Sequence, residues 1–205
     1  MLNPDLFLAF VLITTVLLVT PGPIVTLVVA TGAAHGIRAA LAAVFGTVIG
    51  NALLLASIGF GLTWILGIST LLFEAIRWAG VAYLVSLGVQ AFRNAGRTGE
   101  LRAPQGRVHV WRGLVVAMSN PKTVAFFTAF LPQFVDPSLP AGVQLATMCA
   151  ASVVLAAITD SAWAVAAGLG RRWFLAPERA RVLGRASGAV LVGGGIWLAL
   201  SRRPG

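Results

Sequence analysis

The sequence predicts an all-α integral membrane protein with six transmembrane helices arranged as two inverted three-helix repeats. Of its 205 residues, 58% are hydrophobic and only 10% are charged, whereas a soluble domain carries about 25% charged residues. No Asp, Glu, Lys or Arg falls between Asp5 and Arg38, or between Arg38 and Glu74. Uncharged stretches of more than about 18 residues are typical of transmembrane helices. The composition therefore excludes a cytosolic enzyme, a disulfide scaffold and a disordered linker.

Each predicted span is close to the ~20 residues that a bilayer requires. We expect spans at Leu6–Thr31, Ala39–Thr63, Ser69–Phe92, Gly113–Val135, Ala141–Gly170 and Gly184–Leu200. The first block is expected to be retained, because the segment Met1–Asp5 lacks the positive charge of a signal peptide. In the third span, Glu74 and Arg77 are three residues apart and can pair on one helix face.

The arginines are concentrated in alternate loops. The loops after the first, third and fifth spans carry one, five and five arginines, counting Arg185 beside the sixth span, whereas the C-terminus carries two. Because cytoplasmic loops are rich in Lys and Arg, we expect these loops in the cytoplasm and both termini outside. Basic loops at a membrane face also account for the net charge of +9, so nucleic acid is not an expected partner and the lipid bilayer is.

The longest polar stretch divides the chain into two halves. Residues 93–112 are expected to form a cytoplasmic basic linker between a first three-helix repeat, 1–92, and a second, 113–205. Three spans in each repeat give the two repeats opposite topology, which is the arrangement of inverted-repeat transporters.

A proline motif interrupts the first span and another interrupts the fourth. Each is interpreted as an N-cap residue, Thr20 or Asn120, followed by proline at the first helical position. Non-helical backbone at membrane depth is tolerated only against protein or a wet cavity, and a helix N-terminus there suits a carboxylate. A pair of ordinary proline kinks is the alternative. The candidate substrate-binding residues are Thr20, Pro21, Gly22, Pro23, Asn120, Pro121 and Lys122.

Lys122 requires a counter-charge, because a cation in the first turn of a helix opposes its dipole and an ammonium in hydrocarbon is unfavourable. Asp160 in the fifth span is the intramembrane candidate. One interpretation is a structural bridge that joins spans four and five. The other is a transport pathway in which Lys122 attracts a substrate carboxylate and Asp160 binds an amino group or a coupling proton. Asn51 in the second span corresponds loosely to Asp160, and either helix packing or a coupling role is open for it.

Other motifs favour packing over chemistry. Ala42, Gly46 and Gly50 recur every four residues, which allows close helix contact. We expect this stripe to pack within the monomer, with a homodimer seam as the alternative. The single cysteine, Cys149, is expected to be a small core residue.

The sequence contains no motif of an enzyme. It has no phosphate-cradling glycine loop, zinc helix motif or Gly-x-Ser-x-Gly turn, and His35 lies far from His109 in the sequence. We therefore expect no enzymatic activity, no cofactor and no metal site. Without an ATP site, any pumping must use an ion or solute gradient.

The two proline motifs also carry a family resemblance. Pro21–Pro23, followed by Gly36–Arg38 and the glycine-rich stretch Ala43–Leu62, resembles the start of the LysE/RhtB family of amino-acid exporters. The stretch Asn120–Phe134 is similar to the second signature of that family. Asp160 stands where members often have an acidic residue, whereas Asn51 replaces an acidic residue expected in the second span.

The resemblance implies a secondary exporter of the bacterial inner membrane that moves amino acids or close derivatives outward, in exchange for protons. Alternating access would expose the site to each side in turn. Two other classes remain open: a structural or assembly subunit of a membrane complex, and an ion or metal exporter. The scarcity of intramembrane carboxylates and thiols argues against a metal exporter.

Overall fold

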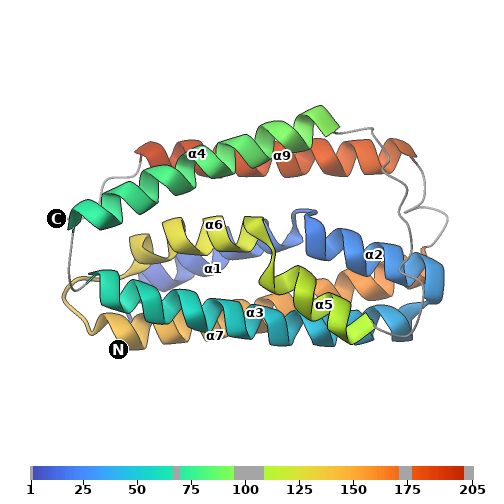
Figure 1. The fold of residues 1–205 in the computed structure, drawn as a ribbon, viewed down its shortest axis with the longest axis horizontal. Helices are drawn as coiled ribbons and strands as arrows, with labels where there is room; N and C mark the ends of the chain where they lie inside the picture. Colours follow the sequence, from blue (N-terminus) through green and yellow to red (C-terminus); the bar gives the residue numbers. More distant parts are fainter. Residues whose placement is uncertain (1, 67–69, 95–108, 171–176, 201–205) are drawn as a thin grey trace.

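A computed structural model describes residues 2–66, 70–94, 109–170 and 177–200, and every regular element in these ranges is helical (Figure 1). This confirms the all-α prediction for the described residues. The elements in chain order are α1 (Pro4–Val19), α2 (Pro23–His35), α3 (Ile37–Leu66), α4 (Thr70–Asn94), α5 (His109–Met118), α6 (Pro121–Phe130), the 3₁₀ helix η1 (Leu131–Phe134), α7 (Ala141–Leu169) and α9 (Pro177–Leu200).

The first and fourth predicted spans are both broken helices. The chain bends by 48° between α1 and α2, and by 42° between α5 and the segment formed by α6 and η1. In both cases the second helix begins with proline, Pro23 or Pro121. Proline lacks an N–H and sets its own φ, so it begins a new helix where the preceding one has ended.

Within the described residues, three helices, α3, α4 and α7, contain apolar windows long enough to cross a bilayer. The number of candidate spans rises to as many as five if each bent pair counts as one. The sixth predicted span, Gly184–Leu200, is a shorter apolar stretch within α9. The predicted linker 93–112 is entered by helix from both sides, because α4 continues to Asn94 and α5 begins at His109. The rest of that linker lies outside the described residues.

In Figure 1, α1, α2 and α6 lie between two outer groups of helices. α4 and α9 pack against each other along one side of the molecule, while α3 packs against α5 and α7 on the other (Figure 1). The start of α1 and the end of α9 lie at one end of the long axis, and the α2–α3 turn lies at the other (Figure 1). That turn depends on Gly36, whose φ of 85° is a left-handed conformation that favours glycine.

The small-residue stripe of α3 packs within the monomer, as expected. A Cβ atom at Gly46 would collide with the Val110 carbonyl of α5, and one at Gly50 would lie 2.6 Å from the Leu114 carbonyl oxygen. Gly113 of α5 makes the reciprocal approach to the backbone of α3. The backbones of the two helices are therefore in direct contact, which only glycine permits at these positions.

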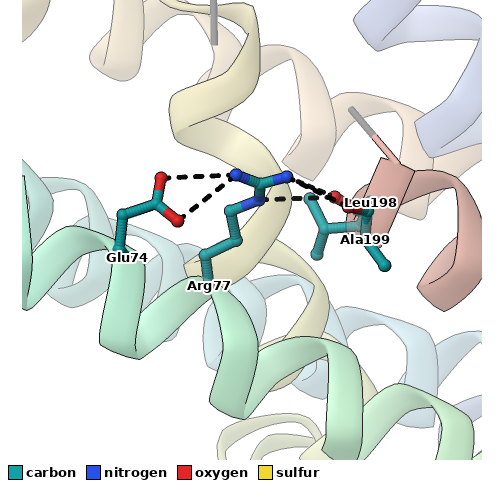
Figure 2. Close-up of polar contacts among 4 residues, drawn as sticks. All are labelled: Glu74, Arg77, Leu198 and Ala199. Carbon is teal, nitrogen blue, oxygen red and sulfur yellow. Dashed lines mark hydrogen bonds and ion pairs between the residues drawn. The ribbon is translucent and has the colours of Figure 1, made fainter. Parts of the chain in front are cut away.

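A buried arginine joins the two helices of the α4–α9 layer (Figure 2). Nη2 of Arg77 donates to the Leu198 carbonyl oxygen at 2.9 Å, and Nη1 forms an ion pair with Glu74 at 3.3 Å. Arg77 thus places a positive charge at the C-terminus of α9, where the helix dipole favours a cation. The predicted pairing of Glu74 with Arg77 is confirmed.

Candidate functional site

The site forms where the two helix breaks meet, near the middle of the long axis (Figure 1). The sequence predicted that Thr20 would be the N-cap residue of the second helix, α2, and this prediction is wrong. Thr20 is the C-cap residue of α1, and its backbone N–H donates to the Leu17 and Val16 carbonyl oxygens. The N-cap residue of α2 is Gly22, and Pro23, not Pro21, occupies the first turn. Two prolines close together displaced the helix start by two residues from the predicted cap.

The second break matches its prediction. Asn120 is the N-cap residue of α6 and Pro121 is the first helical residue. Oδ1 of Asn120 accepts a hydrogen bond from the Lys122 backbone N–H at 3.1 Å, and its Nδ2 donates to Thr123 Oγ1 at 2.8 Å. The two breaks therefore differ: the start of α6 is capped by a side chain, whereas the start of α2 has no side-chain cap.

The Lys122 ammonium bridges the two breaks. Its Nζ atom donates to the carbonyl oxygens of Leu17 at 2.7 Å and Thr20 at 2.6 Å, both at the C-terminal end of α1. Carbonyls at a helix C-terminus carry partial negative charge, so they compensate the cation without a carboxylate. Gly22 makes room for this side chain, because a Cβ atom there would lie 3.1 Å from Lys122 Cδ.

The structural Lys122–Asp160 bridge considered from the sequence is not formed. Both residues are buried and line the same cavity, but Lys122 donates to α1 instead. The sequence correctly indicated that Lys122 needs electrostatic compensation. It could not show that the C-terminal carbonyl groups of α1 would provide this compensation.

Asp160 contacts α3 through a threonine hydroxyl. Thr47 Oγ1 lies 3.2 Å from Asp160 Oδ2 and 2.9 Å from the Val44 carbonyl oxygen. Asp160 is 3% exposed and Thr47 is fully buried. The fifth predicted span thus contributes its carboxyl group to the interior of the molecule and away from lipid.

A cavity of about 30 Å³ lies between these groups. It has room for one or two water molecules, and a buried amide, Asn51, contributes to its wall. Oδ1 of Asn51 is buried and has no hydrogen-bond partner in the structure. The predicted residues on the wall are Thr20, Gly22, Asn51, Asn120, Lys122 and Asp160.

The three predicted prolines are not among the lining residues of this cavity. Pro121 instead borders an open apolar groove between α4 and α6. The Pro21 carbonyl oxygen accepts a hydrogen bond from Ser187 Oγ of α9 at 2.6 Å. The prolines therefore shape and anchor the breaks, while neighbouring residues face the cavity.

Several residues of the site were not identified from the sequence. Thr47 lies one helical turn before Asn51, and this polar i, i+4 spacing in an apolar helix is a signal that could have found it. Leu17 and Ser187 left no comparable signal, because their contacts come from distant segments of the chain. Thr123 contacts Asn120, the N-cap residue of its own helix, three residues earlier.

Leu17 separates the polar cavity from a larger apolar groove. The groove has a volume of about 450 Å³ and runs between α1, α4, α6 and α9. Leu17 lines both spaces, and the aromatic rings of Phe126 and Phe130 stack in the wall of the groove at a centroid distance of 4.5 Å. An apolar space thus adjoins the polar one.

The two histidines, distant in sequence, meet at the end of the molecule where α2 ends and α5 begins. The ring centroids of His35 and His109 are 5.3 Å apart. Across the described ranges, no group of three or more His, Cys, Asp or Glu side chains is arranged to hold a metal ion.

Comparison with known proteins assigns the family. The model of the LysE type translocator family matches residues 15–202. The chain belongs to this family. A LysE type translocator is a multi-pass membrane transporter and not an enzyme, which confirms the resemblance found in the two proline motifs.

Two of the curated relatives match nearly the whole length of this translocator, and a third matches part of it. A homoserine/homoserine lactone efflux protein of Salmonella typhimurium is 31% identical over 197 residues, which are 95% of this chain and 96% of the relative. An uncharacterized membrane protein of Vibrio cholerae serotype O1 is 29% identical over 96% and 97% of the two chains. A leucine efflux protein of Enterobacter sp. is 30% identical over 60% of each chain. No solved structure shows a significant match.

Proposed function

We propose that this translocator exports amino acids or close derivatives across the bacterial inner membrane, in exchange for protons. The relatives named as homoserine, homoserine lactone and leucine efflux proteins support the substrate class. These substrates share an α-amino group and a carboxyl or ester carbonyl. A site for them needs a positive group for the carbonyl end and an acceptor for the amine.

The observation that carries this proposal is the position of Lys122. Its ammonium shares the small cavity with Asp160, Asn51 and the start of α2, which has no side-chain cap. A substrate carboxylate entering this cavity would take hydrogen bonds from Lys122 and from the free N–H groups of α2. Broken helices in transporters present their N-termini to anionic substrate groups in this way.

Asp160 would serve the amine or the coupling proton. It is the second ionisable side chain of the cavity wall, and an ionisable group within a span marks a substrate or proton pathway by default. Asn51 of α3, whose Oδ1 atom has no hydrogen-bond partner, offers a second acceptor for the substrate amine.

Transport would require the cavity to open to each side in turn. A volume of about 30 Å³ is smaller than any amino acid, so this conformation is a closed one. Helices in matching positions of the two halves pack on each other, α3 on α7 and α4 on α9. This supports two inverted repeats, 1–92 and 113–205, that rock about the site.

The membrane orientation proposed here has both termini outside and the basic loops in the cytoplasm. The ends of the described helices support it, because the start of α1 and the end of α9 lie together and opposite to the α2–α3 turn (Figure 1). The arginine count then decides which end is cytoplasmic.

Counterflow of a labelled amino acid in proteoliposomes tests the proposal with the purified protein alone. We expect exchange of homoserine or leucine by the wild type, and its loss in Lys122→Ala and in Asp160→Asn. Ser152→Ala is a matched control on α7, because Ser152 is buried and its Oγ atom donates to its own helix at Met148.

The outcomes separate the competing classes. Exchange that persists in both site variants at equal reconstitution removes these residues from the mechanism. A wild-type protein that exchanges no amino acid in this assay favours a structural or assembly subunit. Exchange of inorganic cations in place of amino acids would assign an ion exporter.

A further inference from the structure

The Thr47 hydroxyl has two acceptors within hydrogen-bond distance. Its Oγ1 atom lies 2.9 Å from the Val44 carbonyl oxygen on its own helix and 3.2 Å from Asp160 Oδ2 on α7. A hydroxyl carries one proton and accepts through two lone pairs. Thr47 therefore donates to only one of these oxygens at a time.

The protonation state of Asp160 determines which oxygen that is. A protonated carboxyl group is itself a donor, so it donates to Thr47 while Thr47 donates to Val44, and both contacts are satisfied. An ionised carboxylate only accepts, so Thr47 must turn its proton toward Asp160. The hydrogen bond to Val44 is then lost.

We propose that Thr47 is a positioning residue of the coupling site, whose hydroxyl turns from the Val44 carbonyl to the Asp160 carboxylate when Asp160 releases its proton to water. This inference rests on the proposed function, in which Asp160 carries the coupling proton. It adds a residue of α3 to that function and states what the proton changes.

The charges around Asp160 are few. α7 packs against α1, α2, α3 and η1, and η1 contains no ionisable residue. Lys122 of α6 is the charged side chain that shares the cavity with Asp160. The ionisable residues of the helices packed against α7 lie in end turns, far from the cavity: Asp5, His35 and Arg38.

Thr47 also lies beside the close backbone contact between α3 and α5, next to Gly46. A Cβ atom at Gly113 of α5 would be 3.0 Å from the Thr47 backbone nitrogen. A threonine hydroxyl bonded to its own helix tends to bend that helix. Transfer of the hydrogen bond from Val44 to Asp160 removes this bond and ties α3 to α7 instead. The protonation state of Asp160 would thereby affect the contacts of α3 with α5 and α7, which join the two halves of the chain.

Thr31 provides a matched control on α2. It is fully buried, and its hydroxyl donates to the Leu27 carbonyl oxygen at 2.7 Å. Its acceptor is a carbonyl of its own helix, so it has the backbone contact of Thr47 without the carboxyl partner. Replacement by valine at either position preserves side-chain shape and removes one hydroxyl.

The test is the pH profile of counterflow in proteoliposomes containing the full-length protein and labelled leucine. A hydrogen bond to a charged group changes a titration by about one pH unit. We expect the pH of half-maximal exchange to move by that amount in Thr47→Val. Thr47→Ser keeps the hydroxyl and should restore the wild-type profile, and Thr31→Val should not change it.

A profile for Thr47→Val that equals the wild-type profile would overturn the inference, as would a Thr47→Ser profile that moves equally far. If the valine variant does not assemble in the membrane, Thr47→Ala replaces it under the same criteria. Loss of exchange in Asp160→Asn is expected from the proposed function itself, so a wild-type profile in that variant would contradict the proposed function as well as the role of Thr47.

Infrared spectroscopy distinguishes a failure of the Thr47 inference from a failure of the proposed function. The carboxyl C=O band that disappears in Asp160→Asn should move in Thr47→Val and not in Thr31→Val, because only the first substitution removes a partner of that carboxyl group. This band needs no transport. An unchanged band in Thr47→Val would overturn the Thr47 contact even if export is confirmed.

Discussion

Two buried cations in this protein are compensated by the C-terminal carbonyls of helices. Lys122 donates to the end of α1, and Arg77 donates to the end of α9. Each cation joins helices from different halves of the chain. Because charge-assisted hydrogen bonds contribute about 1.5–3 kcal/mol, these contacts offset much of the ~2.5–3.5 kcal/mol that a cation costs at the centre of a membrane helix.

Removal of Arg77 should destabilise the α4–α9 layer. Arg77→Ala leaves the Leu198 and Ala199 carbonyls without their guanidinium donor, and we expect the free energy of unfolding to fall by about 2 kcal/mol. Glu74→Gln should lower it by less than about 1 kcal/mol, because the Glu74 side chain is 38% exposed. Denaturant unfolding in detergent measures both, and an equal loss in the two variants would contradict the capping role.

A second residue-scale prediction concerns Asp136, in the loop between η1 and α7. Hydrogen bonds from Ser138, and then from Asn3, hold the pKa of the Asp136 carboxyl group below its ordinary value. The folded state thus binds the proton less tightly than the unfolded state does. The stabilisation is present above about pH 4 and is lost as the pH falls through the lower folded-state pKa.

The thermal midpoint of the wild type should therefore fall between pH 5 and about pH 3 by more than that of Asp136→Asn. Ser138→Ala, which removes the hydroxyl donor at 2.6 Å, should also reduce this acid effect. Differential scanning fluorimetry in detergent provides the measurement. An identical acid loss in the wild type and both variants would show that the loop hydrogen bonds do not couple to folding.

At the scale of elements, the two broken helices are similar in sequence and different in structure. Asn120 caps α6 with its side chain, whereas α2 begins at Gly22, which has none. The position left without a cap is the one through which the Lys122 side chain passes. The break before α6 therefore supplies the cation, Lys122. The break before α2 supplies N–H groups without a side-chain cap and the space for the Lys122 side chain.

The contact between α3 and α5 allows a prediction for an element interface. Gly46→Ala would press a methyl group into the Val110 carbonyl, and overpacking of this kind costs about 1–3 kcal/mol. Gly61→Ala on the same helix meets nothing within 4 Å, so it should leave stability unchanged or raise it by up to about 1 kcal/mol. Chemical unfolding of the two variants in detergent compares them. Equal free energies of unfolding for the two variants would contradict the tight contact of α3 with α5 at Gly46.

At the scale of the whole molecule, the proposed orientation predicts opposite accessibility of the two ends. In a Cys149→Ser background, a cysteine at Pro137 should react with a membrane-impermeant maleimide in right-side-out vesicles. A cysteine at His35 should react only after permeabilisation. Both positions are exposed and lie outside the core of the bundle. The reverse pattern of labelling would invert the topology.

The sequence predicted most of the spans because the bilayer imposes a simple length and polarity requirement on each helix. It located both breaks, since proline removes a backbone donor wherever it stands. It misplaced the start of α2 because two prolines, Pro21 and Pro23, compete for the first turn and only the backbone geometry of Gly22 decides between them. The predicted sixth span, Gly184–Leu200, coincides with the apolar part of α9, which is shorter than the apolar windows of α3, α4 and α7.

The membrane class, the two broken spans, the family and the buried ionisable residues were all determined by the sequence, because each depends on local composition or a short motif. Only the tertiary structure decided that Lys122 binds the end of α1, that Thr47 contacts Asp160, and that Asn51 faces the same cavity. These partners are about 100 residues apart or on different helices. Their contacts follow from how the helices pack, which no local pattern of residues encodes.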